Sequence, residues 1–309
     1  MTGSNLIRRI IFISLTGPGN GGNFFLLVKH VHILVMGPKK KPIDLILIHL
    51  AFANAMTLCA RGIPDVISAL HFSNILGNLG CKATIYLGRV ARGLSICTTC
   101  LLSVVQASTI SPRITFWRKL KPWTAWQVLP YLLFFWIINF FISSNMLHYM
   151  TAVNSMNNSK IGSYVGSCYM LPSKQIVRWL FLSFMALRDI IFLSLMGWSS
   201  GYMALHLCNH HKRVFYLQNF RFVKKSSPEI RATQSTLILM TCFLFFYWAD
   251  FIFSFYGGST LTNDSVILNI KICLGLGYAS LSPFMLMGRD STWLTAGTFT
   301  EKLRKLFLH

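Results

Sequence analysis

The sequence predicts an all-α membrane protein: one domain built as a bundle of seven transmembrane helices. Only 12% of the 309 residues are charged and 53% are hydrophobic, whereas about a quarter of the residues in a soluble domain are charged. The mean hydropathy is +0.53. A membrane helix needs about 20 mainly apolar residues, and polar breaks separate seven such runs. They cover residues 6–35, 43–70, 83–110, 124–142, 176–205, 237–256 and 266–287, and a short tail follows at 288–309.

The first run is the least regular of the seven. Its centre reads Gly17-Pro18-Gly19-Asn20-Gly21-Gly22-Asn23, and Lys29 follows. Membrane helices tolerate Gly and Pro where neighbouring helices satisfy the freed backbone groups, so we expect this run to span the bilayer. The alternative is that this run is degenerate and the protein folds poorly. Pro costs about 3 kcal/mol in a helix interior, and Lys costs roughly 2.5–3.5 kcal/mol at the bilayer centre.

The other six runs are more continuous, and some contain charged residues. The fourth run has no charged side chain, and the sixth has only Asp250. The third run carries Arg89 and Arg92 in its first half, and the fifth carries Arg188 and Asp189 near its middle. Ionisable residues inside a membrane are costly and usually face the interior of the bundle.

The distribution of basic residues predicts the orientation. Seventeen Lys and Arg residues fall in one set of breaks and in the tail, and five fall on the other side. Cytoplasmic loops carry the excess of Lys and Arg, so we expect an extracellular N-terminus and a cytoplasmic C-terminus. The net charge of +21 is thus mainly an orientation signal. We expect these basic residues to interact with the lipid bilayer and not with nucleic acid.

Two kinds of residue on the expected outer side agree with this orientation. Asn157 and Asn263 each begin an N-glycosylation tripeptide. Cys81 lies at the outer start of the third run and Cys168 in the long loop after the fourth. Both cysteines face an oxidising compartment, where a disulfide can persist, so we expect them to form one. The alternative is two unpaired apolar cysteines.

Several stretches together resemble a known family. The third run reads Tyr86-Leu87-Gly88-Arg89-Val90-Ala91-Arg92-Gly93-Leu94-Ser95 and ends in Ile110-Ser111-Pro112. Further stretches are Ala186-Leu187-Arg188-Asp189, His210-His211-Lys212-Arg213-Val214, Ser227-Pro228-Glu229-Ile230-Arg231, Phe246-Tyr247-Trp248 and Ser282-Pro283-Phe284. This pattern resembles the vomeronasal type 1 receptors, a family of seven-helix pheromone receptors, over almost the whole chain.

The resemblance implies a multi-pass G-protein-coupled receptor in the plasma membrane of sensory neurons. Such a receptor binds a small pheromone-like ligand from outside and activates a heterotrimeric G protein of the inhibitory type, without cofactor, metal or enzymatic activity. Where the rhodopsin-like class has Asp-Arg-Tyr, this chain has Val105-Gln106-Ala107, and Asn54 replaces that class's Asp in the second helix. We therefore do not expect activation of this receptor to depend on a bound sodium ion or on an Arg side chain at the inner end of the third helix.

The charged and aromatic residues of the outer half are the candidate ligand site. Aromatic groups supply apolar area, while a few charges orient a small ligand. The candidates are Tyr86, Arg89, Arg92, Asp189, Tyr247 and Asp250. The alternative is a structural ion-pair network that joins the helices. On the inner face, the candidates for G-protein contact are Gln106, Arg113, Lys212, Arg213 and Arg231, although topology alone explains their positive charge.

Other interpretations of the sequence are weaker. Gly197-Trp198-Ser199-Ser200-Gly201 matches a serine nucleophile pattern, but that chemistry needs a strand-to-helix turn and a His base. A bitter-taste-type receptor is a second seven-helix candidate, against which the Arg-x-x-Arg of the third run argues. A transporter or channel is a third candidate, but the two halves of the chain show no repeat of the kind that is common in transporters.

Overall fold

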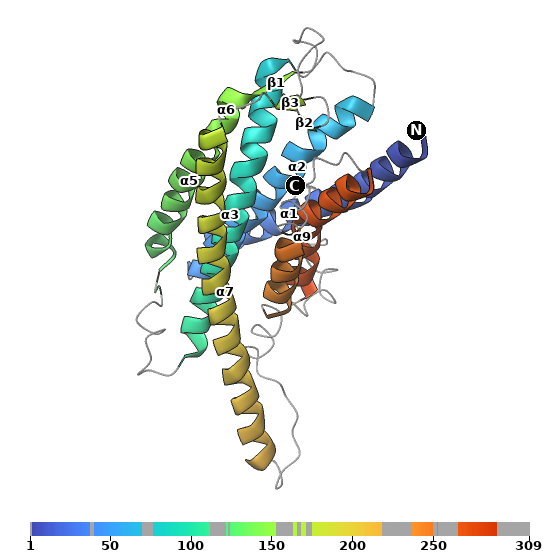
Figure 1. Cartoon of the computed structure of the whole chain (residues 1–309). Coiled ribbons are helices and arrows are strands. Elements are labelled where there is room, and N and C mark those ends of the chain that lie inside the picture. The colour runs from blue at the N-terminus through green and yellow to red at the C-terminus, as the bar shows by residue number, and fades with distance from the viewer. Residues whose placement is uncertain are drawn as a thin grey trace.

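The computed structural model shows a helical bundle with a small β-sheet at one end (Figure 1). It describes residues 2–37, 40–69, 77–111, 122, 124–152, 163–165, 168–170, 175–217, 237–249, 252 and 265–288. The elements are α1 (Thr2–Met36), α2 (Pro42–Ala69), α3 (Asn78–Ile110), η1 (Ala125–Gln127), α5 (Leu129–Ser143), α6 (Asn145–Tyr149), α7 (Gln175–Leu217), a helix over Leu237–Ala249, and α9 (Ser265–Gly288). Because η1, α5 and α6 follow one another in one segment, these helices form seven spans.

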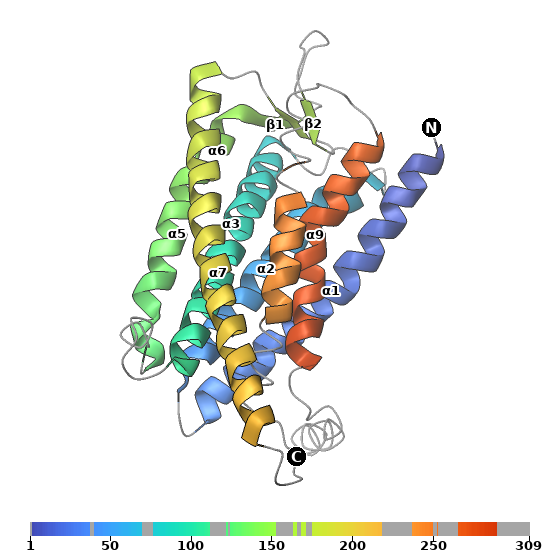
Figure 2. The ribbon, with the colours of Figure 1, turned by 60° about the horizontal axis from the view of Figure 1, so that its bottom comes forward.

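Helix α3 lies at the centre of the bundle and packs against α2, α5 and α7. In Figure 2, α5 and α7 lie on one side of it, and α1 and α9 lie next to each other on the other. Many of its buried residues are small, among them Gly88, Ala91, Gly93, Ser95 and Cys97. Small side chains let helices approach closely in a membrane, which explains why this helix occupies the middle.

Four of the described helices are long and apolar enough to cross a membrane: Pro42–Ala60, Asn78–Ile110, Ala125–His148 and Trp179–Asn209. Two further apolar helices, Leu237–Ala249 and Cys273–Met287, are shorter in the described part of the chain. The outer surfaces of α5 and α7 are lined with exposed apolar side chains such as Phe134, Ile137, Phe141, Leu187 and Ile191. Such surfaces suit contact with lipid tails.

Two features differ from the expectations from sequence. Helix α7 continues to Leu217, well beyond the expected end at residue 205, and projects past the rest of the bundle (Figure 1). No Gly or Pro interrupts the polar stretch His210-His211-Lys212-Arg213, so the helix does not have to end at the membrane surface. The strands β1 (Met150–Ala152), β2 (Ser163–Val165) and β3 (Cys168–Met170) form an antiparallel sheet in the order β1-β3-β2, which the sequence analysis did not predict.

The irregular first run forms one continuous helix, α1, with Pro18 inside it. Its inward face consists of Gly19, Gly22, Asn23, Leu26 and His30, all of which are buried. This spacing of three and four residues places them on one side of the helix. Pro18 lies on the exposed side.

The glycines and the asparagine of this face allow α1 to pack closely against α9. A Cβ atom on Gly19 would lie 2.9 Å from the Cα atom of Ser280, and one on Gly22 would lie 2.9 Å from Cγ of Pro283. Asn23 donates from Nδ2 to the carbonyl oxygen of Ala279 at 2.9 Å. Gly19, Gly22 and Asn23 of the irregular run therefore make specific contacts with α9.

A polar contact also joins α1 to α2. Nδ1 of His30 lies 3.0 Å from Oδ1 of Asp44, and both side chains are buried. Asp44 lies in the first turn of α2, where the helix dipole favours a negative charge. The contact gives both polar groups a partner.

We predict that Gly19→Ala lowers the thermal unfolding midpoint of the purified full-length protein, whereas Gly21→Ala leaves it unchanged or raises it. The added methyl group at position 19 meets the α9 backbone, while position 21 has no neighbouring atom within 4 Å. In a helix, Ala is favoured over Gly by roughly 0.5–1 kcal/mol. Equal midpoints for the two variants would contradict the close α1–α9 contact.

Candidate functional site

A small cavity lies between α2, α3, α9 and the helix Leu237–Ala249. Its volume is about 30 Å³, and its lining includes Asn54, Arg92, Ser95, Phe243, Tyr247 and Tyr278. This space holds one or two water molecules and is too small for a whole organic ligand. We refer to this packing of the helices around the small cavity as the closed arrangement.

Arg92 and Tyr247 meet at this cavity. The guanidinium carbon of Arg92 lies 4.9 Å from the centroid of the Tyr247 ring, a distance at which the cation is attracted by the π-face of the ring. Tyr247 is only 6% exposed, and its hydroxyl group makes no hydrogen bond of standard geometry, although it interacts electrostatically with Asp189. A buried hydroxyl without such a hydrogen bond is unfavourable, so this group is available to a ligand or a water.

The ring of Tyr247 continues into a row of aromatic residues. It stacks on Phe243 with centroids 5.6 Å apart, and Phe243 meets Tyr278 edge-on at 4.3 Å. The hydroxyl of Tyr278 lies 2.9 Å from Oγ1 of Thr99. Because Thr99 donates its own proton to the carbonyl of Ser95, Tyr278 is the donor in this pair. The row thus connects the cavity to the centre of α3.

Two polar side chains on other helices hold Asn54 at the base of the cavity. Ser95 of α3 donates to Oδ1 of Asn54 at 2.7 Å, and Nδ2 of Asn54 donates to Oγ of Ser282 at 2.8 Å. The resulting network joins α2, α3 and α9. The described residues that line the cavity include no carboxylate, so they offer a cation no negatively charged ligand group.

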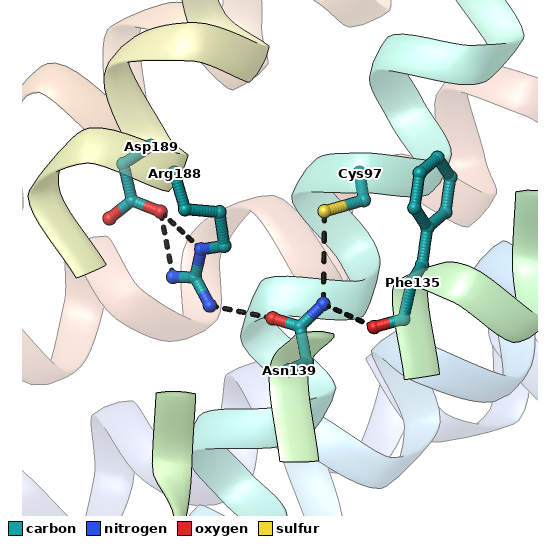
Figure 3. Close-up of polar contacts among 5 residues, drawn as sticks. All are labelled: Cys97, Phe135, Asn139, Arg188 and Asp189. Carbon is teal, nitrogen blue, oxygen red and sulfur yellow. Dashed lines mark hydrogen bonds and ion pairs between the residues drawn. The ribbon is translucent and has the colours of Figure 1, made fainter. Parts of the chain in front are cut away.

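Arg188 and Asp189 form a buried cluster next to α3 and α5 (Figure 3), close enough to the cavity to interact electrostatically with Tyr247. Nε and Nη2 of Arg188 donate to Oδ1 of Asp189 at 2.8 and 2.7 Å, and Nη1 donates to Oδ1 of Asn139 at 2.6 Å. Asn139 in turn donates to the carbonyl of Phe135 at 2.7 Å and contacts Sγ of Cys97 at 3.8 Å. The guanidinium group thus joins α7 to α5, and Asn139 continues the contact to Cys97 of α3.

Gly93 of α3 makes room for this cluster. A Cβ atom at this position would overlap both Oδ1 of Asn139 and Nη1 of Arg188. Gly93 and Asn139 are not among the site residues expected from the sequence. Asn139 could have been found, because it is the one polar side chain in the apolar stretch Leu132–Ile142, and polar residues in membrane helices usually form hydrogen bonds across helices.

The six predicted ligand-site residues do not converge on one point. Arg92 and Tyr247 line the cavity, and Asp189, which is bonded to Arg188, lies close enough to interact with Tyr247. Tyr86 stacks on Phe140 of α5 with centroids 6.1 Å apart and donates to the carbonyl of that residue at 3.3 Å. Arg89 is half-buried, one turn before Arg92. Asp250 lies outside the described residues.

The other predicted positions fall at the two ends of the bundle. Cys81 is buried and disulfide-bonded, and Cys168 begins β3. Gln106 is buried near the opposite end of α3, and Lys212 and Arg213 lie in the projecting part of α7, where their side chains are not described. Asn157, Asn263, Arg113 and Arg231 lie outside the described residues. Within the part of the chain that the structure describes, no group of three His, Cys, Asp or Glu residues could hold a metal ion.

We predict that Asn139→Leu lowers the unfolding free energy by roughly 1–3 kcal/mol, because it leaves Nη1 of the buried Arg188 without its acceptor. The measurement is thermal or denaturant unfolding of the purified protein. Ile137→Leu is the matched control, since it introduces the same residue two positions away on the exposed side of α5. An Asn139→Leu variant as stable as this control would contradict the role of the cluster.

Comparison with known proteins identifies the family. The model of the vomeronasal organ pheromone receptor family matches residues 6–296. The chain is 32% identical to human vomeronasal type-1 receptor 4 over 91% of its own length and 93% of that protein. It is 35% identical to rat vomeronasal type-1 receptor 100 and to mouse vomeronasal type-1 receptor 51, in each case over 94% of its length, covering 87% and 89% of those proteins. The chain therefore belongs to the vomeronasal type 1 receptors, a family of seven-helix membrane receptors.

Proposed function

We propose that this chain binds a small pheromone-like ligand in the outer half of its bundle and activates a heterotrimeric G protein of the inhibitory type. Membership of a pheromone receptor family supports ligand recognition. The single observation that carries the site is the contact of Arg92 with the face of Tyr247 at a buried cavity. A cation, an aromatic ring and a hydroxyl without a standard hydrogen bond together suit a ligand with a polar or anionic group on an apolar body.

The proposed orientation places the N-terminus outside the plasma membrane and the C-terminus in the cytoplasm. In addition to the distribution of Lys and Arg, the position of the disulfide supports it. Cys81 lies near the start of α3, which packs against β1, and α1 begins at this same end of the bundle (Figure 2). Because disulfides persist in oxidising compartments, the end with the sheet is the outer end.

The proposed partner of Cys81 is Cys168. Strand β3, which begins at Cys168, pairs with β1, and β1 lies next to α3, which carries Cys81. The other six cysteines of the chain are free. A disulfide here would tie the loop between α6 and α7 to the third helix. We further propose that Asn157 and Asn263 carry glycans on this outer side.

The ligand acts, in this proposal, by shifting the population of helix arrangements. The cavity is too small for a whole ligand in the closed arrangement, so binding must move the helix Leu237–Ala249 or α9 away from α3. The row of Tyr247, Phe243 and Tyr278 connects the ligand site to the centre of α3. At the inner face, Gln106, Arg113, Lys212, Arg213 and Arg231 contact the G protein in the open arrangement.

Within the site, the residues have different roles. Arg92 and Tyr247 contact the ligand, and Tyr86, Arg89 and Asp250 are further candidates for ligand contact. Asp189 is a positioning residue, since its carboxylate holds the Arg188 guanidinium against Asn139. A change at Asp189 therefore acts through the packing of α3, α5 and α7.

We predict that Arg92→Ala raises the ligand concentration for half-maximal response at least tenfold while surface expression is kept. The loss of the cation removes the group that orients the polar end of the ligand. Cells expressing the receptor with an inhibitory-type G protein are screened with small alcohols, ketones and carboxylic acids, and active compounds are titrated on the variant. Lys82→Ala, on the same helix but outside the cavity lining, is the control.

Two outcomes would overturn this assignment. An unchanged response of Arg92→Ala would remove the residue from the ligand site. Loss of the receptor from the cell surface would show instead that Arg92 is needed for folding, as the structural alternative holds.

We also predict that the response disappears when the cells are treated with the toxin that ADP-ribosylates inhibitory-type α subunits. The chain supplies no transport path of its own in this proposal, so every ligand signal passes through the G protein. A response that survives the toxin would exclude the inhibitory type. A ligand-triggered current in cells without G protein would favour the channel alternative.

A further inference from the structure

Gln106 has an unusual environment for a buried amide. It is 6% exposed, and neither Oε1 nor Nε2 has a hydrogen-bond partner. Among the described residues, no other side chain has two buried polar atoms that both lack a partner. The other buried polar side chains of α3 do make hydrogen bonds: Ser95, Thr98, Thr99, Ser103 and Ser108. Buried amides without partners are rare and call for an explanation.

The position of Gln106 suggests that explanation. It lies four residues before the end of α3 at Ile110, at the end of the bundle opposite the sheet. It follows Thr99 by seven residues, which places both on one face of the helix, and Thr99 faces Tyr278 of α9. The amide is thus enclosed on the side of α3 that faces the interior of the bundle.

Two contacts hold α3 and α7 together around this position. The hydroxyl groups of Ser103 and Ser199 lie 2.5 Å apart, and those of Ser111 and Tyr202 lie 2.9 Å apart. They join the two helices one turn before and more than one turn after Gln106. These two contacts therefore stabilise the closed arrangement on both sides of Gln106, whose own amide has no hydrogen-bond partner in that arrangement.

We propose that Gln106 biases the receptor toward opening at the inner end of α3. In the closed arrangement its amide is buried from bulk solvent and has no partner in the protein, so that arrangement is raised in free energy. Opening exposes the amide to water and to the backbone of the docked G protein, and both can satisfy its donor and its acceptor. This inference rests on the proposed function for the identity of the partner, but the energetic bias does not depend on it.

The chemistry of the side chain fits such a role. A glutamine is neutral, so it can be enclosed without a charged partner, and the neighbouring residues in the chain, Val105 and Ala107, offer none. A charged group at this point would need an ion-pair partner or would cost far more to bury. The amide thus supplies a moderate penalty that opening can remove.

The test compares Gln106→Met with Thr99→Val in the full-length protein. Both variants replace a polar side chain by an apolar one of similar shape. We expect Gln106→Met to raise the thermal midpoint of the ligand-free receptor, without G protein, by about 2–4 °C. Thr99→Val should lower the midpoint, because it leaves the hydroxyl of Tyr278 without its acceptor. A midpoint for Gln106→Met at or below that of the wild type would overturn the proposal.

A second measurement separates a bias toward opening from a simple gain in stability. Hydrogen–deuterium exchange of the backbone at residues 100–111 reports opening of this end in the receptor alone. We expect Gln106→Met to slow it about tenfold, equal to roughly 1.4 kcal/mol. Unchanged exchange, with a raised midpoint, would show that the amide penalises folding in general and would overturn the bias.

Nucleotide exchange on an added inhibitory-type G protein completes the test. We expect ligand-independent activation by Gln106→Met to fall by about the same factor as the hydrogen exchange. If the wild-type receptor activates no G protein of any type, the proposed function fails, and the two measurements on the receptor alone still decide whether Gln106 favours opening.

Discussion

The structure depends on one constraint: inside a membrane, each buried polar group must find its partner on another helix or on its own backbone, because water does not supply one. Helix α3 shows how this is met. Its hydroxyl groups bond to the preceding turn or to α7 and α9, and Ser95 reaches Asn54 of α2. These bonds set which faces of the helices meet, since apolar contact with lipid and with protein is nearly equivalent.

The cluster of Arg188, Asp189 and Asn139 applies the same constraint to charge. A buried ion pair is stable only when the remaining donors are also satisfied, and Asn139 takes the donor that Asp189 leaves free. Gly93 is part of this arrangement because its missing side chain leaves the space the two polar groups occupy. The cluster thereby holds α3, α5 and α7 together close to the cavity.

The unsatisfied groups are informative for the same reason. Tyr247 at the cavity and Gln106 near the other end of the bundle are among the buried side chains that make no hydrogen bond of standard geometry, whereas the other buried polar side chains of α3 are bonded. A receptor needs two arrangements of similar free energy, and incomplete satisfaction of the closed one reduces the gap between them. In the proposed mechanism, ligand contact at Tyr247 and opening at Gln106 each remove part of this penalty.

The sequence by itself determined the membrane class, the seven helical runs and the family, because hydrophobic length and local motifs are properties of consecutive residues. It also indicated which residues face the interior, since Arg92, Arg188 and Asp189 cannot face lipid cheaply. Only the tertiary structure decided which residues contact each other. Asp189 accepts hydrogen bonds from Arg188, and Tyr86 packs against Phe140 of α5. Gly19 and Gly22 of the irregular first helix pack closely against α9. These outcomes depend on the distance and rotation between helices, which are set by contacts between residues far apart in the chain.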